Sequence, residues 1–392
     1  MKSNKWCHFR HKVFTEIARL IFKIFLFLKY GYRARISKIN NKQNYLIIAN
    51  HAASLDPFLL GLSFKFPIYY VASEDLMKNK FVSKLLSYAL APIPIKKGIT
   101  DLVCIKRCIK VAKEGGSIAI FPEGNRTYSG DLLKLDKSIV KLVRLLKIPL
   151  ILYHIEGGYG IDPRWGYKGR KSNGAYGEVR KVLSLEEINS LSDEELLNTI
   201  EETISYSSNE NLIYKSKRQA EYLERILFVC PKCHKLETIY SNKNTFSCKT
   251  CSLEGEYHKD LSLSFNDTSI SFKTISDWMK FQRDFIYKHQ FTSPILLSDN
   301  NVELLFTSTT KNKELINKGN LFMYEDRFEL VGKGKTDTYY FKDISEVVNQ
   351  GKHKLLFYIG NDYYQFKGEP RFSSYKYYLT YQKLNNSYDR LL

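Results

Sequence analysis

A histidine and a carboxylate stand at a spacing that suits general base catalysis. His51 follows a short apolar segment, residues 44–49, and Asp56 comes five positions later, where a helix is expected to begin. In that arrangement Asp56 can hold one imidazole nitrogen while the other takes a proton from a substrate hydroxyl. The alternative is that Asp56 only caps the helix and that His51 is a surface loop residue.

A second polar segment, residues 121–127, also follows an expected strand and reads Phe-Pro-Glu-Gly-Asn-Arg-Thr. The planar guanidinium of Arg126 suits a phosphate group. Glu123 can accept hydrogen bonds from a substrate or brace Arg126, and Gly124 lets the backbone approach a ligand closely. The alternative is a Pro-Gly turn that carries a surface ion pair.

Together these two segments resemble the 1-acylglycerol-3-phosphate, or lysophospholipid, acyltransferase family, and the resemblance covers about residues 36–200. A basic stretch, residues 94–98, and an Ile-Pro-Leu stretch, residues 148–150, agree with the family in order. The resemblance implies that His51 is the general base and that Asp56 orients it. It also implies an acceptor-binding set, which comprises Lys97, Glu123, Gly124 and Arg126.

The implied reaction moves a fatty acyl group from a thioester donor, acyl-CoA or acyl carrier protein, to a lysophosphatidic-acid-like acceptor. Its product is phosphatidic acid for phospholipid synthesis. Lys97 stands where the family usually has Arg, and a lysine cannot bind a phosphate bidentately. Another lysophospholipid or a glycolipid therefore stays an alternative acceptor.

Four of the seven cysteines form two Cys-x-x-Cys pairs, Cys230 with Cys233 and Cys248 with Cys251. Two such pairs at this spacing predict a zinc ribbon, in which four thiolates close a tetrahedral structural site. An odd cysteine count favours a reducing compartment over a disulfide framework. The ribbon can staple a small domain or dock a protein, and fusion to an acyltransferase favours these roles over nucleic-acid binding.

Alternating patterns between residues 36 and 215 predict an α/β acyltransferase domain with a mostly parallel sheet, whose polar strand ends meet at one edge. The expected strands span residues 44–49, 68–72, 117–121 and 149–153. The expected helices span residues 74–90, 101–113, 136–146 and 185–206.

Residues 1–35 predict a basic amphipathic helix. Lys12, Glu16, Arg19 and Lys23 form one polar stripe, and apolar residues between Phe14 and Leu28 fill the opposite side. Such a helix suits the headgroup region of a membrane, because its charges interrupt the apolar run too often for a spanning segment. We therefore expect a peripheral or monotopic protein at the cytoplasmic face of the cell membrane. The alternative is a helix that packs on its own domain.

The rest of the chain is expected to form two parts: a connector helix with the zinc ribbon, residues 216–262, and a small β-rich domain, residues 263–392. The connector helix is expected over residues 215–227. Six short alternating runs between residues 302 and 366 predict strands, and helices are expected over residues 277–290 and 373–384. This layout resembles pleckstrin-homology or GRAM modules.

The formal net charge of +19 favours a polyanionic partner, such as anionic lipid, a phosphorylated substrate or nucleic acid. The motifs favour an enzyme at a lipid surface. A non-enzymatic protein that binds nucleic acid or protein through its ribbon is the third hypothesis. It predicts that loss of His51 has no effect.

Overall fold

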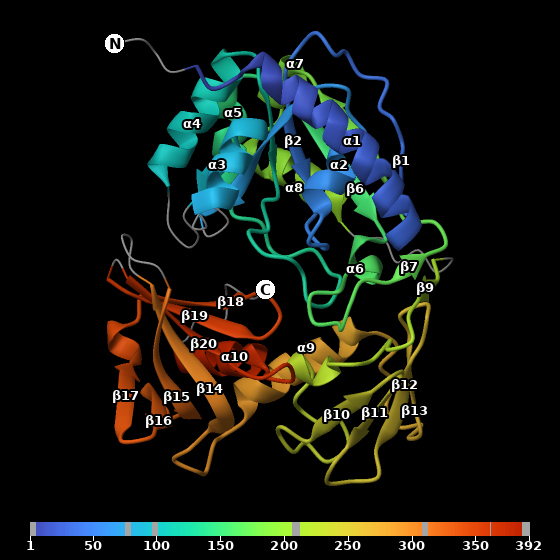
Figure 1. Cartoon of the computed structure of the whole chain (residues 1–392). Coiled ribbons are helices and arrows are strands. Elements are labelled where there is room, and N and C mark those ends of the chain that lie inside the picture. Colours follow the sequence, from blue (N-terminus) through green and yellow to red (C-terminus); the bar gives the residue numbers. More distant parts are fainter. Residues whose placement is uncertain are drawn as a thin grey trace. The chain divides into compact units, whose positions relative to one another are not determined.

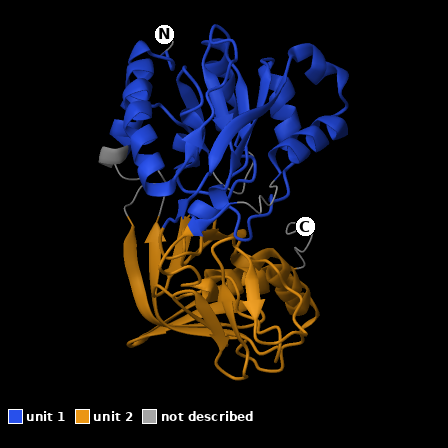
Figure 2. Ribbon diagram, turned by 90° about the vertical axis from the view of Figure 1, so that its right-hand side faces the viewer, with its two compact units in different colours: residues 1–163, 169–214 blue, residues 164–168, 215–392 orange. Residues whose placement is uncertain are grey.

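The computed structural model describes residues 5–74, 80–95, 101–205, 212–307, 313–360 and 362–385 (Figure 1). The chain divides into two compact units (Figure 2). Unit 1 contains residues 1–163 and 169–214, and unit 2 contains residues 164–168 and 215–392.

A mixed sheet forms the centre of unit 1. Its strands are β1 (Arg33–Ala34), β2 (Leu46–Ala49), β3 (Ile68–Ser73), β4 (Ile93–Ile95), β5 (Ser117–Ile120), β6 (Leu150–Glu156) and β8 (Tyr176–Leu183). They lie in the order β1-β8-β6-β2-β5-β3-β4, and among these strands only the β6–β8 pairing is antiparallel. The predicted mostly parallel α/β sheet is thus confirmed in outline, with β8 as the addition that makes it mixed.

Helices of unit 1 follow the strands in the expected alternation. They are α1 (Phe9–Tyr30), α2 (Asp56–Gly61), α3 (Lys80–Ala89), α4 (Leu102–Lys113), α5 (Ser138–Leu146), α6 (Gly158–Ile161), α7 (Leu185–Ser190) and α8 (Asp193–Ile204). The single helix predicted over residues 185–206 is wrong. It is two helices, because Ser184 and Ser192 each begin one with a capping box to Glu187 and Glu195.

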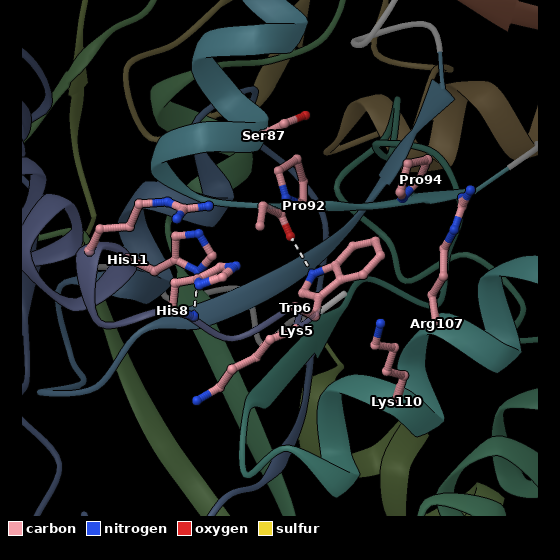
Figure 3. Close-up of a pocket in the computed structure, with 11 residues that line it drawn as sticks. Lys5, Trp6, His8, His11, Ser87, Pro92, Pro94, Arg107 and Lys110 are labelled. Carbon is pink, nitrogen blue, oxygen red and sulfur yellow. Dashed lines mark hydrogen bonds between the residues drawn. The ribbon is translucent and has the colours of Figure 1, made fainter. Parts of the chain in front are cut away.

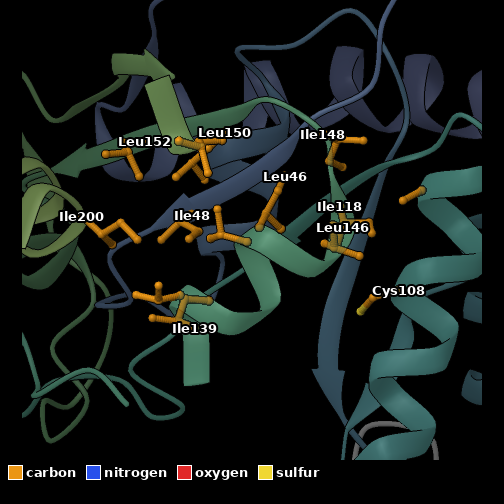
Figure 4. Close-up of a cluster of buried hydrophobic side chains, with 14 of the residues drawn as sticks. Leu46, Ile48, Cys108, Ile118, Ile139, Leu146, Ile148, Leu150, Leu152 and Ile200 are labelled. Atoms are coloured by element: carbon orange, nitrogen blue, oxygen red, sulfur yellow. The ribbon is translucent and has the colours of Figure 1, made fainter. Parts of the chain in front are cut away.

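The core of unit 1 explains why its strands are short apolar runs. All four residues of β2 are buried, because helices cover both faces of a parallel sheet. Leu46 and Ile48 pack with Ile118 and Leu150 from neighbouring strands and with Ile139 of α5 (Figure 4). This packing fixes the strand ends, from which the polar loops project.

Helix α1 keeps an apolar face in solvent. It packs through its buried residues His11, Leu26 and Tyr30. The predicted polar stripe is divided, because Lys23 is exposed whereas Arg19 is half-buried and donates to the Phe64 carbonyl at 2.7 Å. The exposed apolar residues are Phe9, Val13, Ile17, Leu20, Ile21, Ile24, Phe25, Phe27 and Leu28. Within the described part of the chain, no helix combines the length and apolar character that a membrane span requires.

Unit 2 begins where the connector helix was predicted, and that prediction is wrong. Residues 214–215 form β9 (Tyr214–Lys215), which pairs with β7 (Lys171–Ser172), and only a short 3-10 turn, η2 (Leu223–Arg225), follows. The Ala220 N–H binds the Lys243 carbonyl, and the Ser241 hydroxyl accepts from the Tyr222 N–H. These bonds to the ribbon replace the bonds that a helix would make, so the segment wraps the ribbon instead.

Two antiparallel sheets complete unit 2. The ribbon sheet contains β10 (Ile239–Asn242), β11 (Thr245–Cys248), β12 (Glu254–Tyr257) and β13 (Leu263–Phe265), followed by α9 (Ile275–Lys288). The larger sheet contains β14 (Leu297–Thr307), β15 (Glu314–Met323), β16 (Arg327–Gly332), β17 (Lys335–Tyr340), β18 (Glu346–Gln350), β19 (Lys354–Ile359) and β20 (Asp362–Lys367). Helix α10 (Ser374–Leu384) packs on β18 and β19. The six predicted strands and both predicted helices are present, and β18 is additional; the likeness to pleckstrin-homology or GRAM modules stays a prediction.

Candidate active site

His51 and Asp56 meet at the carboxyl end of β2. The His51 Nδ1 atom lies 2.8 Å from a carboxylate oxygen of Asp56, Oδ2. Asp56 is fully buried, and the same oxygen accepts the backbone N–H groups of Ala52 and Ala53 at 2.7 and 3.0 Å. The His51 side chain is 23 % exposed, and its Nε2 atom makes no hydrogen bond to a described residue. One ring nitrogen is therefore fixed and the other faces outward.

The backbone around His51 is held by its neighbours. The Asn50 side chain, which is buried, bridges to the β6 backbone by accepting the Ile155 N–H at 2.8 Å and donating to the Ile155 carbonyl at 3.1 Å. The His51 ring stacks on Phe121, with 4.6 Å between the ring centroids. Asn50 was missed from the sequence, although it directly precedes His51 at a strand end.

Glu123 binds the backbone of His51 itself. Because β2 and β5 are adjacent and parallel, the loops after them meet, and the His51 N–H donates to Glu123 Oε1 at 2.6 Å. The other oxygen, Oε2, accepts the Leu133 N–H at 3.0 Å. Both carboxylate oxygens are thus engaged with backbone, and neither binds Arg126. The predicted part of Glu123 in binding the acceptor stays a prediction.

Burial makes Glu123 a pH-sensitive element of this site. Desolvation raises its pKa from 4.5 to about 8, and the N–H groups of Leu133 and His51 act in the opposite direction. Between these two values the folded chain binds more protons than the unfolded chain, so the free energy of unfolding must fall as pH rises.

Glu123→Gln is expected to remove this pH dependence. The free energy of unfolding of the wild type, relative to the variant, should fall by up to about 1.4 kcal/mol per pH unit between pH ~5 and ~8. Amide hydrogen exchange of β2 and β5 measures this difference for unit 1 alone. A difference that stays constant over the range would contradict the raised pKa.

Arg126 is linked to the His51 loop by a carboxylate that was not predicted from the sequence. Arg126 Nη1 lies 3.3 Å from Asp162 Oδ2, and the same oxygen accepts the Ser54 N–H at 2.9 Å and the Ser54 hydroxyl. Asp162 follows α6, shortly after β6, so its position near a strand end was the one available signal. Asp162 thus ties the residue 50–56 loop to the residue 121–127 loop.

Gly124 and Lys97 are the two remaining residues that were predicted to bind substrate. Gly124 has a backbone φ of +66°, and a Cβ atom built there would meet no other atom within 4 Å. A glycine is therefore favoured by the turn itself, and the turn is open to a ligand. Lys97 lies outside the described residues.

The four predicted ligand cysteines gather in the ribbon. Their sulfur atoms all lie within 4.8 Å of one another, with 3.7 Å between the Cys230 and Cys251 sulfurs and 3.7 Å between those of Cys233 and Cys248. A tetrahedral zinc with Zn–S bonds of about 2.3 Å places its sulfur ligands about 3.8 Å apart. The donor set and its spacing therefore fit Zn²⁺.

Comparison with known proteins places residues 33–154 in a family described as acyltransferase. A 1-acyl-sn-glycerol-3-phosphate acyltransferase of Borreliella burgdorferi is 32 % identical over 122 residues, which are 30 % of this chain and 48 % of that protein. Its namesake from Bacillus subtilis is 31 % identical over 29 % of this chain and 59 % of that protein. The chain thus spans about half the length of these relatives.

The crystal structure of a 1-acyl-sn-glycerophosphate acyltransferase from Thermotoga maritima aligns with 50 % of this chain and 78 % of that chain, at a TM-score of 0.43 and 23 % identity. The family match contains His51, Asp56, Glu123, Gly124 and Arg126 and ends within β6. Residues 33–154 thus match the acyltransferase family, and the two relatives are named 1-acyl-sn-glycerol-3-phosphate acyltransferases.

Proposed function

We propose that this chain transfers a fatty acyl group from a thioester donor to the free hydroxyl of lysophosphatidic acid, giving phosphatidic acid. The observation that carries the proposal is the His51 ring, which the buried Asp56 holds through Nδ1 while Nε2 stays accessible. The names of the relatives from Borreliella burgdorferi and Bacillus subtilis support this acceptor.

The reaction follows from the orientation of the ring. Nε2 of His51 takes the proton from the acceptor hydroxyl as its oxygen attacks the thioester carbonyl carbon. Asp56 stabilises the imidazolium that forms, the carbon–sulfur bond breaks, and the leaving thiolate receives the proton from His51. The product ester forms directly, so no acyl-enzyme is required. Acyl-CoA and acyl carrier protein both supply such a thioester.

Arg126 is the described cation best placed for the acceptor phosphate. Its side chain is 15 % exposed, and the exposed turn at Gly124 leaves room for a ligand beside it. Asp162 holds Arg126 through Nη1, which limits its motion and orients the guanidinium fork. Lys97 is proposed as a second phosphate ligand, on the resemblance alone.

The apolar face of α1 supports action at a membrane surface. Phe9, Leu20 and Leu28 are 79, 67 and 61 % exposed, and the exposed Lys12 and Lys23 accompany them. An exposed apolar strip with cations beside it suits the headgroup region of a bilayer containing anionic lipid. We propose that the chain acts at the cytoplasmic face of the cell membrane, on an acceptor with one acyl chain.

The ribbon is proposed to hold a structural Zn²⁺ through Cys230, Cys233, Cys248 and Cys251. When bound, the metal closes the two Cys-x-x-Cys turns into one unit and supplies no chemistry to acyl transfer. A β-rich sheet as small as this ribbon has little core of its own, so such a staple contributes directly to its folding.

An acceptor panel tests the proposed function. Purified chain in detergent or vesicles is mixed with acyl-CoA or acyl carrier protein and with labelled lysophosphatidic acid, another lysophospholipid or a monoacylglycerol. We expect phosphatidic acid as the main product and a kcat/KM about 10- to 100-fold lower for monoacylglycerol, which lacks the phosphate that Arg126 binds. Faster turnover of another lysophospholipid or a glycolipid would replace the acceptor, and no turnover with any acceptor would contradict the proposal.

A further inference from the structure

A basic pocket lies at the start of α1, away from His51. It has a volume of about 450 Å³, within the range of about 300–1,000 Å³ that is usual for ligand pockets. The cationic side chains in its lining are Lys5, Arg10, Arg107 and Lys110, and its described lining contains no carboxylate. Figure 3 shows Arg107 and Lys110 entering on one side of Trp6, with His8 and His11 on the other.

Hydrogen bonds hold the pocket in shape. The Trp6 indole N–H donates to the Ala91 carbonyl at 3.1 Å, and the Arg10 guanidinium donates to the Tyr88 carbonyl at 3.0 Å. Glu114, the nearby acidic residue, is engaged by the backbone N–H groups of Trp6 and Cys7 at 2.7 and 2.8 Å. The Glu114 carboxylate lies 4.0 Å from the Lys110 ammonium group, so it offsets one of the four positive charges in the lining. Three cations remain in the lining.

His11 is a buried part of the pocket lining. Its side chain lines the pocket yet is only 1 % exposed, and Nε2 has no hydrogen-bond partner among the described residues. Burial, assisted by Arg10 and His8, lowers its pKa to about 4, so the ring is neutral. Nδ1 lies 3.1 Å from the Tyr69 hydroxyl and 3.4 Å from the His8 backbone nitrogen, so either ring nitrogen can carry the proton of the neutral ring. His11 therefore adds a neutral polar group to the pocket lining and no negative charge.

The pocket and His51 lie at opposite edges of the sheet. Glu114, which anchors Trp6, stands just before β5 begins, whereas His51 follows the end of β2, the parallel neighbour of β5. Helix α1 runs from the pocket edge to the catalytic edge. Directly after it, Arg33 of β1 pairs with Tyr176 of β8, and Tyr176 pairs with Glu156 at the carboxyl end of β6. The apolar face of α1 thus extends from the pocket toward the catalytic edge.

We propose that the pocket at the start of α1 binds the phosphate group of an anionic ligand. The described lining combines four cationic side chains with no carboxylate, which is the chemistry that a phosphate requires. A phospholipid headgroup is one source, because the pocket adjoins the exposed face of α1; a soluble phosphate compound is the other. The site is separate from the catalytic residues and does not depend on the proposed activity.

Paired variants of α4 test this site in the full-length chain. The pocket variant carries Arg107→Gln and Lys110→Gln, and the control carries Lys106→Gln and Lys113→Gln, which removes the same charge from exposed positions of the same helix. Binding is measured to phosphatidylcholine vesicles with and without phosphatidylglycerol, and to inorganic pyrophosphate and CoA in solution. Melting temperatures confirm that both variants fold.

The pocket variant is expected to lose about tenfold in affinity for one anionic probe, with about twofold or less for the control. Loss confined to the phosphatidylglycerol vesicles assigns the site to a lipid headgroup, and loss confined to pyrophosphate or CoA assigns it to a soluble phosphate compound. Equal losses in the two variants, or no loss in either, would overturn the proposal, because binding would then depend on overall charge and not on this pocket.

Discussion

His51→Ala is expected to lower kcat for acyl transfer by about 10²- to 10⁴-fold, with little change in KM, because it removes the group that accepts the hydroxyl proton. The assay is steady-state acyl transfer to labelled lysophosphatidic acid. His258→Ala, in unit 2, is the control and should keep the wild-type rate. Wild-type turnover by His51→Ala would exclude the proposed base.

The Asp56 carboxylate does not cap α2, because it binds N–H groups of the loop before that helix, and Asp56→Asn separates its role in orienting His51 from its role in holding this loop. The amide oxygen of Asn can still accept the N–H groups of Ala52 and Ala53, so the loop before α2 should persist. Its neutral side chain cannot stabilise an imidazolium, and kcat should fall by about 10²-fold or more. An unchanged kcat in a folded Asp56→Asn variant would leave Asp56 with the role of holding the loop alone.

The catalytic loops were predictable because each motif follows a strand. His51 and Glu123 come directly after β2 and β5, and parallel neighbours bring such positions to one edge. The sequence supplied Asp56 as the partner of His51 but not the partners of Glu123 and Arg126. Glu123 was expected to contact substrate or Arg126, yet its carboxylate binds backbone, and Asp162 holds Arg126 instead. Such pairings depend on loop conformation, on which residue type and spacing give little information.

Errors in the helix predictions have a common origin in tertiary contacts. The charged residues of the 215–227 segment recur at the regular spacing of a helix. However, Ala220, Leu223 and Leu227 are buried beside the ribbon. The backbone φ of Tyr222 is +78°, a value outside the range of a right-handed helix. In α1, Arg19 was predicted to lie on the polar stripe, whereas its guanidinium is half-buried and donates to the Phe64 carbonyl. Periodicity identified α1 as a helix but not the face that it buries.

Chelation of zinc is expected to unfold the ribbon. Structural zinc sites contribute an apparent binding free energy of about 10–16 kcal/mol to folding at neutral pH, which is as large as the whole stability of a typical domain, about 5–15 kcal/mol. The purified chain should hold one zinc, measured by elemental analysis, and amides of β10 and β11 should lose their protection from hydrogen exchange after the metal is removed.

Cysteine variants assign this effect to the four sulfurs. Cys233→Ser should abolish the bound zinc and expose β10 and β11, because three thiolates and a hydroxyl bind zinc far more weakly. Cys7→Ser, in unit 1, removes a half-buried thiol outside the ribbon and should leave the zinc content unchanged.

The ribbon also carries contacts that need no metal. The Trp278 indole N–H donates to the Val229 carbonyl at 2.9 Å, and the Gln282 side-chain oxygen accepts the Phe228 N–H at 2.7 Å. If these contacts sufficed, β10 and β11 would stay protected in the zinc-free chain, and the metal would not be the staple of the ribbon.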